Sequence, residues 1–121
     1  MELQKQVCSL ELSKQLKNLG FKQESYFYWN HQDYSGDVFY NITHIPGKGI
    51  NAYQECYAYT VAELGEMLPY KYNNFRDVDE KYHCVAKFDD LSKDKNLYIS
   101  SKTESDARAK MLIYLKENNL I

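Results

Sequence analysis

The stretch Thr60–Pro69, which reads TVAELGEMLP, carries the local signals that decide the fold. Thr60 and Glu63 have the spacing of a capping box, in which the hydroxyl accepts from the N3 amide and the carboxylate accepts from the N-cap amide. Pro69 limits the extension of a helix because the residue before a proline avoids helical geometry. The sequence therefore predicts a short helix at about Val61–Leu68, with strand-like segments on both sides of it.

Two further segments have the periodicity of amphipathic helices. The first is about Leu10–Leu19, with Ser9 as its predicted N-cap and Gly20 as a left-handed stop. The second is about Glu104–Asn118, with Thr103 at its predicted N-terminal cap. Apolar residues recur every three or four positions in both segments, so each helix is expected to bury one face.

Strands are predicted in the segments that lie between these helices. The five segments are about Ser25–Asn30, Asp37–Ile42, Ala52–Tyr59, His83–Phe88 and Leu97–Ser100. They are rich in aromatic and β-branched residues or alternate in polarity, and strands follow strands through short connections. We predict one α+β domain over residues 1–121, with a mainly antiparallel sheet of about five strands, three helices and the order α-β-β-β-α-β-β-α.

Composition excludes several classes of protein. The 121 residues include 15 Lys and Arg against 17 Asp and Glu, a net charge of −2, so no basic surface for duplex nucleic acid is indicated. The longest apolar run, Met111–Leu115, is far too short to span a membrane, and no membrane partner is expected. The three cysteines are odd in number and far apart, and no secretory signal opens the sequence, so we expect reduced thiols and a cytoplasmic location in a bacterial cell.

Neither a metal site nor a catalytic group is predicted from residue spacing. The candidate soft ligands are Cys8, His31, His44, Cys56, His83 and Cys84. They lack the short repeats that zinc sites use, so we expect no metal and no cofactor. The acids of Asp77–Glu80 and Asp89–Asp90 are interleaved with Lys and Arg and favour solvated loops. No catalytic residue is assigned, although these acids leave a metal-dependent hydrolase as an alternative.

Tyrosine is the unusual component. Ten of the twelve tyrosines lie between Tyr26 and Tyr82, and the segment Gln23–Pro69 has six acids and one lysine, a net charge of −5. A stacking platform for single-stranded nucleic acid needs a basic groove, whereas aromatic residues without basic charge suit protein contacts. An ordinary covering layer of the sheet remains the alternative. The candidate binding residues are Tyr28, Trp29, Tyr53, Tyr57 and Tyr59.

Three stretches taken together carry a resemblance. They are residues 7–29, with VCSLEL, LG and FYW in order; residues 60–69, TVAELGEMLP; and residues 106–121, with DARAKMLIYL, EN and LI. The chain resembles in these stretches a family of small uncharacterised proteins carried by bacteriophages, prophages and gut bacterial genomes. The resemblance implies an intracellular, phage-associated origin. It transfers no catalytic residue, because the family has no assigned activity.

Three functions remain as hypotheses from the sequence. The first is a non-enzymatic accessory protein that binds another protein, or a second copy of itself, through the acidic and tyrosine-rich sheet region. The second is a nucleic-acid-binding module that uses basic residues of the C-terminal half. The third is a metal-dependent hydrolase at the clustered acids.

Overall fold

The structure is a computed structural model, and it describes residues 3–21, 24–34, 37–43, 52–68, 72–76, 81–87 and 96–121. The elements within these ranges are α1 (Leu3–Gln6), α2 (Leu10–Asn18), β1 (Tyr28–Tyr34), β2 (Asp37–Thr43), β3 (Ala52–Tyr57), α3 (Val61–Met67), β4 (Tyr72–Arg76), β5 (Tyr82–Lys87), β6 (Asn96–Ser101) and α4 (Glu104–Glu117). The predicted α+β class with antiparallel strands is confirmed. The short helix α1 and the strand β4 are additions to the predicted order.

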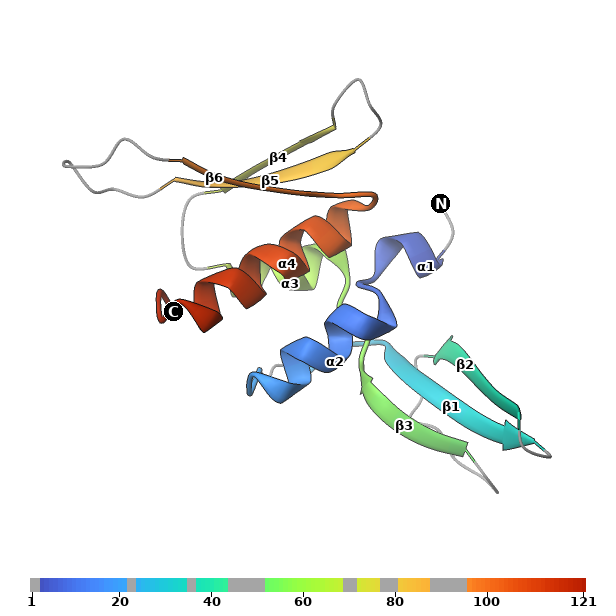
Figure 1. Cartoon of the computed structure of the whole chain (residues 1–121). Helices are drawn as coiled ribbons and strands as arrows, with labels where there is room; N and C mark the ends of the chain where they lie inside the picture. The colour runs from blue at the N-terminus through green and yellow to red at the C-terminus, as the bar shows by residue number, and fades with distance from the viewer. Residues whose placement is uncertain are drawn as a thin grey trace.

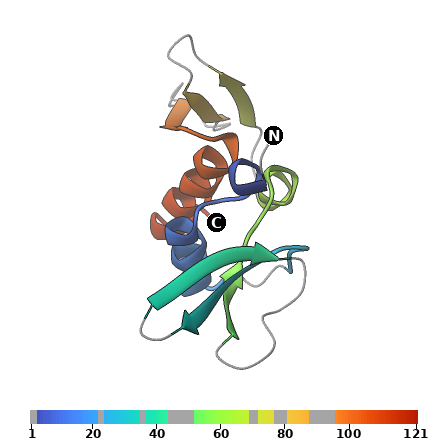
Figure 2. The same cartoon turned by 90° about the vertical axis from the view of Figure 1, so that its right-hand side faces the viewer.

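The strands form two sheets with the helices between them. One sheet has the order β2-β1-β3 and the other has the order β4-β5-β6, and all neighbouring strands in both are antiparallel. Figure 1 shows the β4–β6 sheet along α4 and the β1–β3 sheet near α2, and Figure 2 shows the helices between the two sheets. The sequence predicts a single sheet. The structure divides it because α3 carries the chain from the end of β3 to the other side of the helices.

Local capping signals are realised as predicted. The Thr60 hydroxyl accepts from the Glu63 amide at 3.2 Å, and the Glu63 carboxylate accepts from the Thr60 amide at 2.9 Å, which completes the capping box of α3. Ser9 caps α2, and Gly20 follows that helix with a φ of +90°. A left-handed φ at this position favours glycine, because a side chain would strain the backbone there. Thr103 caps α4 by accepting from the backbone amide of residue 106 at 3.2 Å.

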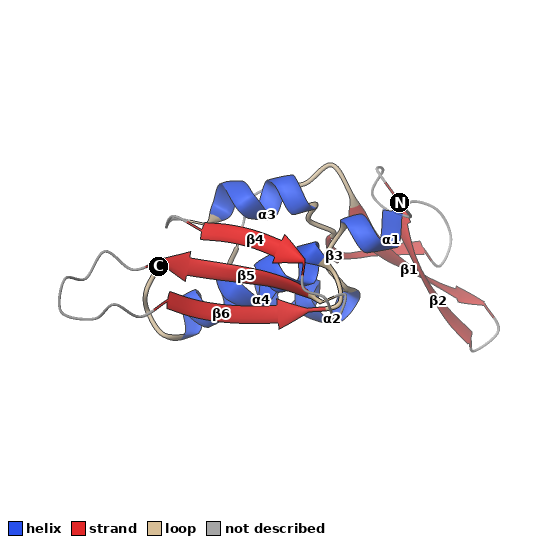
Figure 3. Cartoon of the chain, turned by 90° about the horizontal axis from the view of Figure 1, so that it is seen from above, coloured by secondary structure: helices blue, strands red, loops and turns tan. Residues whose placement is uncertain are grey.

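Helix α4 is the centre of the hydrophobic core. It contacts α1, α2 and α3 on one side and strands β5 and β6 on the other, and Figure 3 shows it beneath the β4–β6 sheet. Both faces of this helix are therefore covered over most of its length. The buried core residues are Cys8, Leu12, Leu16, Tyr59, Leu64, Leu68, Cys84, Ala107, Ala109, Met111, Leu112, Ile113 and Leu115.

A β-bulge interrupts the pairing of β1 with β3. Trp29 pairs with Cys56 and Asn30 pairs with Gln54, so Glu55 is the extra residue of the bulge. An extra residue ends the strict alternation of side chains along a strand. The strand stops at residue 57, so the predicted strand Ala52–Tyr59 is two residues too long at its C-terminal end.

No helix in the described part of the chain is long and apolar enough to cross a membrane.

Candidate functional site

Three of the five predicted binding residues form one row of rings. The Tyr28 and Tyr57 ring centroids are 5.3 Å apart, and those of Tyr57 and Tyr59 are 5.8 Å apart. The row begins in β1, crosses to the paired residue at the end of β3, and continues into the segment that leads to α3. The structure describes no side-chain placement for Tyr53, so this candidate lies outside the comparison.

The prediction that all of these aromatic residues are available to a partner is not supported at two positions. Tyr59 is only 2% exposed and belongs to the core cluster, and burial raises the pKa of its hydroxyl well above the usual range. The Trp29 indole is half-buried and donates to the Cys8 carbonyl oxygen at 3.0 Å. Tyr28 and Tyr57 are half-buried and keep part of their rings at the surface.

An acidic groove lies beside α3. It has a volume of about 780 Å³, and the residues that carry its chemistry are Glu24, Tyr26, Glu63 and Glu66. Tyr26 is 79% exposed, the most open aromatic side chain among the described residues. No Lys or Arg is among the described residues that line the groove. The charged side chains among these described lining residues are therefore all acidic, and they share the groove with the exposed Tyr26 ring.

Glu63 connects the two segments that line this groove. Its Oε1 accepts from the Ser25 hydroxyl at 2.8 Å as well as from the Thr60 amide, and its Oε2 accepts from the Tyr26 amide at 3.2 Å. The Ala58 carbonyl oxygen lies 3.2 Å from the same hydroxyl and shares its single proton with Glu63. The capping carboxylate of α3 thus fixes the segment that presents Tyr26. The sequence predicted that Glu63 belongs to the capping box of α3. The hydrogen bonds of Glu63 to residues 25 and 26 depend on the tertiary fold.

A second pocket lies between the end of α2 and β3. Its volume is about 420 Å³, and its lining includes Lys17, Phe21, Cys56, Tyr57 and Tyr59. Sequence reasoning placed Tyr57 and Tyr59 at the candidate site but overlooked Lys17 and Phe21. The only signal for this pocket in the sequence was the pair of lysines in the last half of α2. Their position is also explained by the helix dipole, which favours positive charge near the C-terminal end of a helix.

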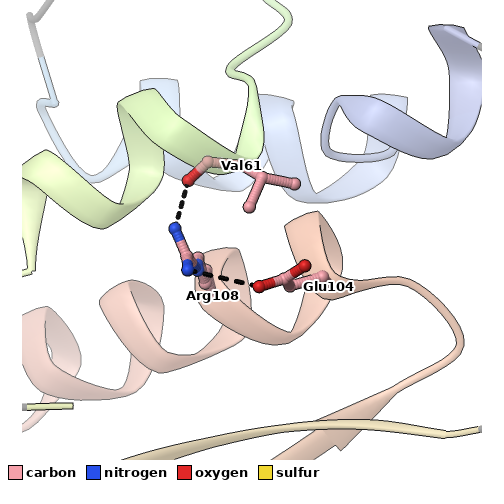
Figure 4. A network of polar contacts seen from close by, with 3 residues as sticks. All are labelled: Val61, Glu104 and Arg108. Carbon is pink, nitrogen blue, oxygen red and sulfur yellow. Dashed lines mark hydrogen bonds and ion pairs between the residues drawn. The ribbon is translucent and has the colours of Figure 1, made fainter. Parts of the chain in front are cut away.

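The α3 helix that borders the acidic groove is anchored to α4 by an arginine. Arg108 of α4 donates to the Val61 carbonyl oxygen at 2.6 Å and pairs with Glu104 at 3.2 Å (Figure 4). A guanidinium can serve two acceptors at once because its donors are arranged in a fork. This contact joins the first turn of α3 to the core helix and so sets the position of the groove.

All three cysteines are free and buried. Burial raises the pKa of Cys8 to about 12 and the pKa values of Cys56 and Cys84 to about 11. A thiol nucleophile needs the opposite shift, because the thiolate is the reactive form. These thiols therefore have the properties of small core residues.

Protonated thiols predict a loss of stability at alkaline pH. A thiol whose pKa is raised in the folded state contributes stability that is complete below its unfolded pKa of 9.0 and is lost as the pH rises through the folded value. We expect the free energy of unfolding to fall from about pH 9 up to about pH 12 in urea titrations. The decline should be shallower in Cys8→Ala than in the parent protein. Equal slopes for both proteins would contradict the assignment.

The described residues contain no cluster of three or more His, Cys, Asp or Glu side chains with the geometry of a metal site. His83 and Cys84 are neighbours on β5, and Cys84 is buried in the core. His44 and the acids of Asp77–Glu80 and Asp89–Asp90 lie outside the described residues. The hydrolase hypothesis therefore gains no geometric support from the described part of the chain.

Comparison of the chain with models of known protein families, with curated proteins and with solved structures finds no match.

Proposed function

We propose that this protein is a small non-enzymatic accessory protein of phage or prophage origin that binds a basic segment of another protein. The observation that carries the proposal is the acidic groove beside α3, where Glu24, Glu63 and Glu66 surround the exposed Tyr26. The segment Gln23–Pro69 has a net charge of −5, so the groove lies within the acidic region of the chain.

Two physical effects would act on such a partner. The three carboxylates attract Lys and Arg side chains and raise the rate of encounter, an effect that salt weakens. Tyrosine adds a large ring with few rotatable bonds, which is why it is enriched in protein interfaces. The groove also lies close to the row of tyrosine rings, since the Glu24 carboxylate is near enough to Tyr57 to contribute, after burial, to its raised pKa.

The proposal is tested by binding of a lysine-rich peptide to the full chain. The probe is a fluorescent decapeptide of alternating Lys and Ala, and its affinity is measured by anisotropy at low and moderate ionic strength. We expect the double variant Tyr26→Ser with Glu66→Gln to weaken binding about tenfold, the equivalent of about 1.4 kcal/mol. Neither side chain is in the core, so the variant is expected to fold.

The matched control removes the same chemistry from another part of the surface. Tyr98 is 60% exposed on β6, and Glu117 is exposed at the end of α4. Tyr98→Ser with Glu117→Gln should leave the affinity for the peptide unchanged. Equal losses in both double variants, or no binding of the peptide at low ionic strength, would overturn the proposal. Tighter binding of a single-stranded oligonucleotide than of the peptide would favour the nucleic-acid hypothesis instead.

A further inference from the structure

The pocket between the end of α2 and β3 differs in chemistry from the acidic groove. The rings of Phe21, Tyr57 and Tyr59 supply apolar walls, and the Cys56 thiol adds a buried, uncharged surface. The volume of about 420 Å³ falls within the range of small-molecule sites, which are mostly apolar with a few polar groups. The volume and the aromatic lining therefore suit a flat apolar body, which can stack on the rings.

Lysine residues supply positive charge near this pocket. Lys17 belongs to its lining, and the Lys116 ammonium lies 5.9 Å from the centroid of the Phe21 ring. After the dominant effect of burial, Lys17 is the strongest influence on the Cys56 thiol, and Lys14 acts on the thiol in the same direction. Lys17 thus places an ammonium group in the lining of a pocket that belongs to a net acidic protein.

The acidic side chain of the lining is already engaged. The Glu55 carboxylate lies within ion-pair distance of the His31 imidazole. The Lys17 ammonium instead donates to the neutral backbone carbonyl oxygen of Glu55 at 2.8 Å. An ammonium has three donors, so Lys17 can also bind an anion at the pocket edge. Glu24, which acts on the Tyr57 hydroxyl, belongs to the neighbouring groove.

We propose that this pocket binds a small organic anion with a flat apolar body, of the class of aromatic carboxylates, with the rings of Phe21 and Tyr57 against the body and Lys17 at the carboxylate. The inference goes beyond the proposed protein contact. It concerns a separate pocket and a ligand of the opposite charge.

The test uses two probes of the same shape and different charge. Naphthalene-2-carboxylate and the neutral naphthalene-2-carboxamide are titrated into the full chain, and amide shifts are followed by heteronuclear NMR. We expect the carboxylate to shift the amides of Gly20, Phe21, Cys56 and Tyr57, which surround the pocket. The carboxamide should bind at the same place with an affinity about tenfold lower, the equivalent of about 1.4 kcal/mol for one charged contact.

The variant Lys17→Gln isolates the charge. Its side chain is exposed, so the fold should survive, and carboxylate affinity should fall about tenfold while carboxamide affinity changes little. Lys110→Gln, an exposed lysine of α4 outside the pocket lining, is the matched control and should change neither affinity. Equal effects of the two lysine variants, equal affinity of the two probes, or no shifts at the pocket amides at about millimolar ligand would overturn the inference.

The same measurements separate this inference from the proposed protein contact. Tyr26→Ser with Glu66→Gln should keep the carboxylate affinity of the parent protein, because neither residue lines this pocket. Lys17→Gln should likewise keep the affinity for the lysine-rich peptide. Loss of carboxylate binding in the double variant would overturn the assignment to the α2–β3 pocket.

Discussion

Replacing Leu112 by alanine is expected to lower the free energy of unfolding by about 2–5 kcal/mol, the usual cost of a leucine-sized cavity in a packed core. Leu112 has no exposed surface, and it lies in α4, the helix that contacts both the other helices and the β4–β6 sheet. The effect is measured by urea unfolding, followed by the fluorescence of Trp29 and by far-ultraviolet circular dichroism.

The two signals also test whether the two sheets share one core. Trp29 reports on the β1–β3 sheet, whereas circular dichroism reports on the whole chain. Because α4 and α2 pack together and connect the two sheets, we expect coincident transitions that shift equally in Leu112→Ala. Lys110→Ala, an exposed change on the same helix, should have little effect. A shift in circular dichroism alone would contradict a common core.

The second large effect is expected at Glu63. Replacing it by alanine removes the acceptor of the Thr60 amide, the Ser25 hydroxyl and the Tyr26 amide, and should cost about 2–3 kcal/mol, because hydrogen bonds to a charged acceptor are among the stronger ones. Urea unfolding gives the size of the loss. Glu66→Ala, three residues further along the same helix at an exposed position, is the matched control and should change stability little.

Replacing Glu63 by glutamine distinguishes the contributions of the two carboxylate oxygens. The single carbonyl oxygen of the glutamine can keep the Oε1 contacts with Ser25 and Thr60, while the bond that Oε2 accepts from the Tyr26 amide is lost. We expect an intermediate loss of stability and faster hydrogen exchange at the Tyr26 amide. A glutamine variant as unstable as the alanine variant would show that charge, rather than the number of acceptors, stabilises this junction.

Helices were predictable because their signals are local. The capping box of Thr60 and Glu63 and the left-handed stop at Gly20 depend on residues within one turn, and the structure has both. The observed strands that were predicted lie within a few residues of the positions expected from composition. The division into two sheets could not be predicted, since pairing partners far apart in sequence leave no local trace, and β4 was missed because Tyr72–Arg76 lacks a clear alternating pattern.

The candidate site was predictable only in its composition. The excess of tyrosine and the acidic charge identified the region, and Tyr28 and Tyr57 do make a ring contact near the surface. The burial of Tyr59 was missed, because the predicted strand Ala52–Tyr59 includes both tyrosines, and alternate residues of a strand share one face. The strand ends between them, and the chain turns Tyr59 into the core.

By itself, the sequence determined the α+β class, the boundaries of α2, α3 and α4 to within about one residue, and the acidic, tyrosine-rich character of residues 23–69. These properties depend on neighbouring residues or on counting. Only the tertiary structure decided which tyrosines reach the surface. It also placed Lys17 of α2 beside Tyr57 and joined Glu63 to Tyr26. These contacts link positions about forty residues apart, and such proximity follows from the packing of the core rather than from any local pattern.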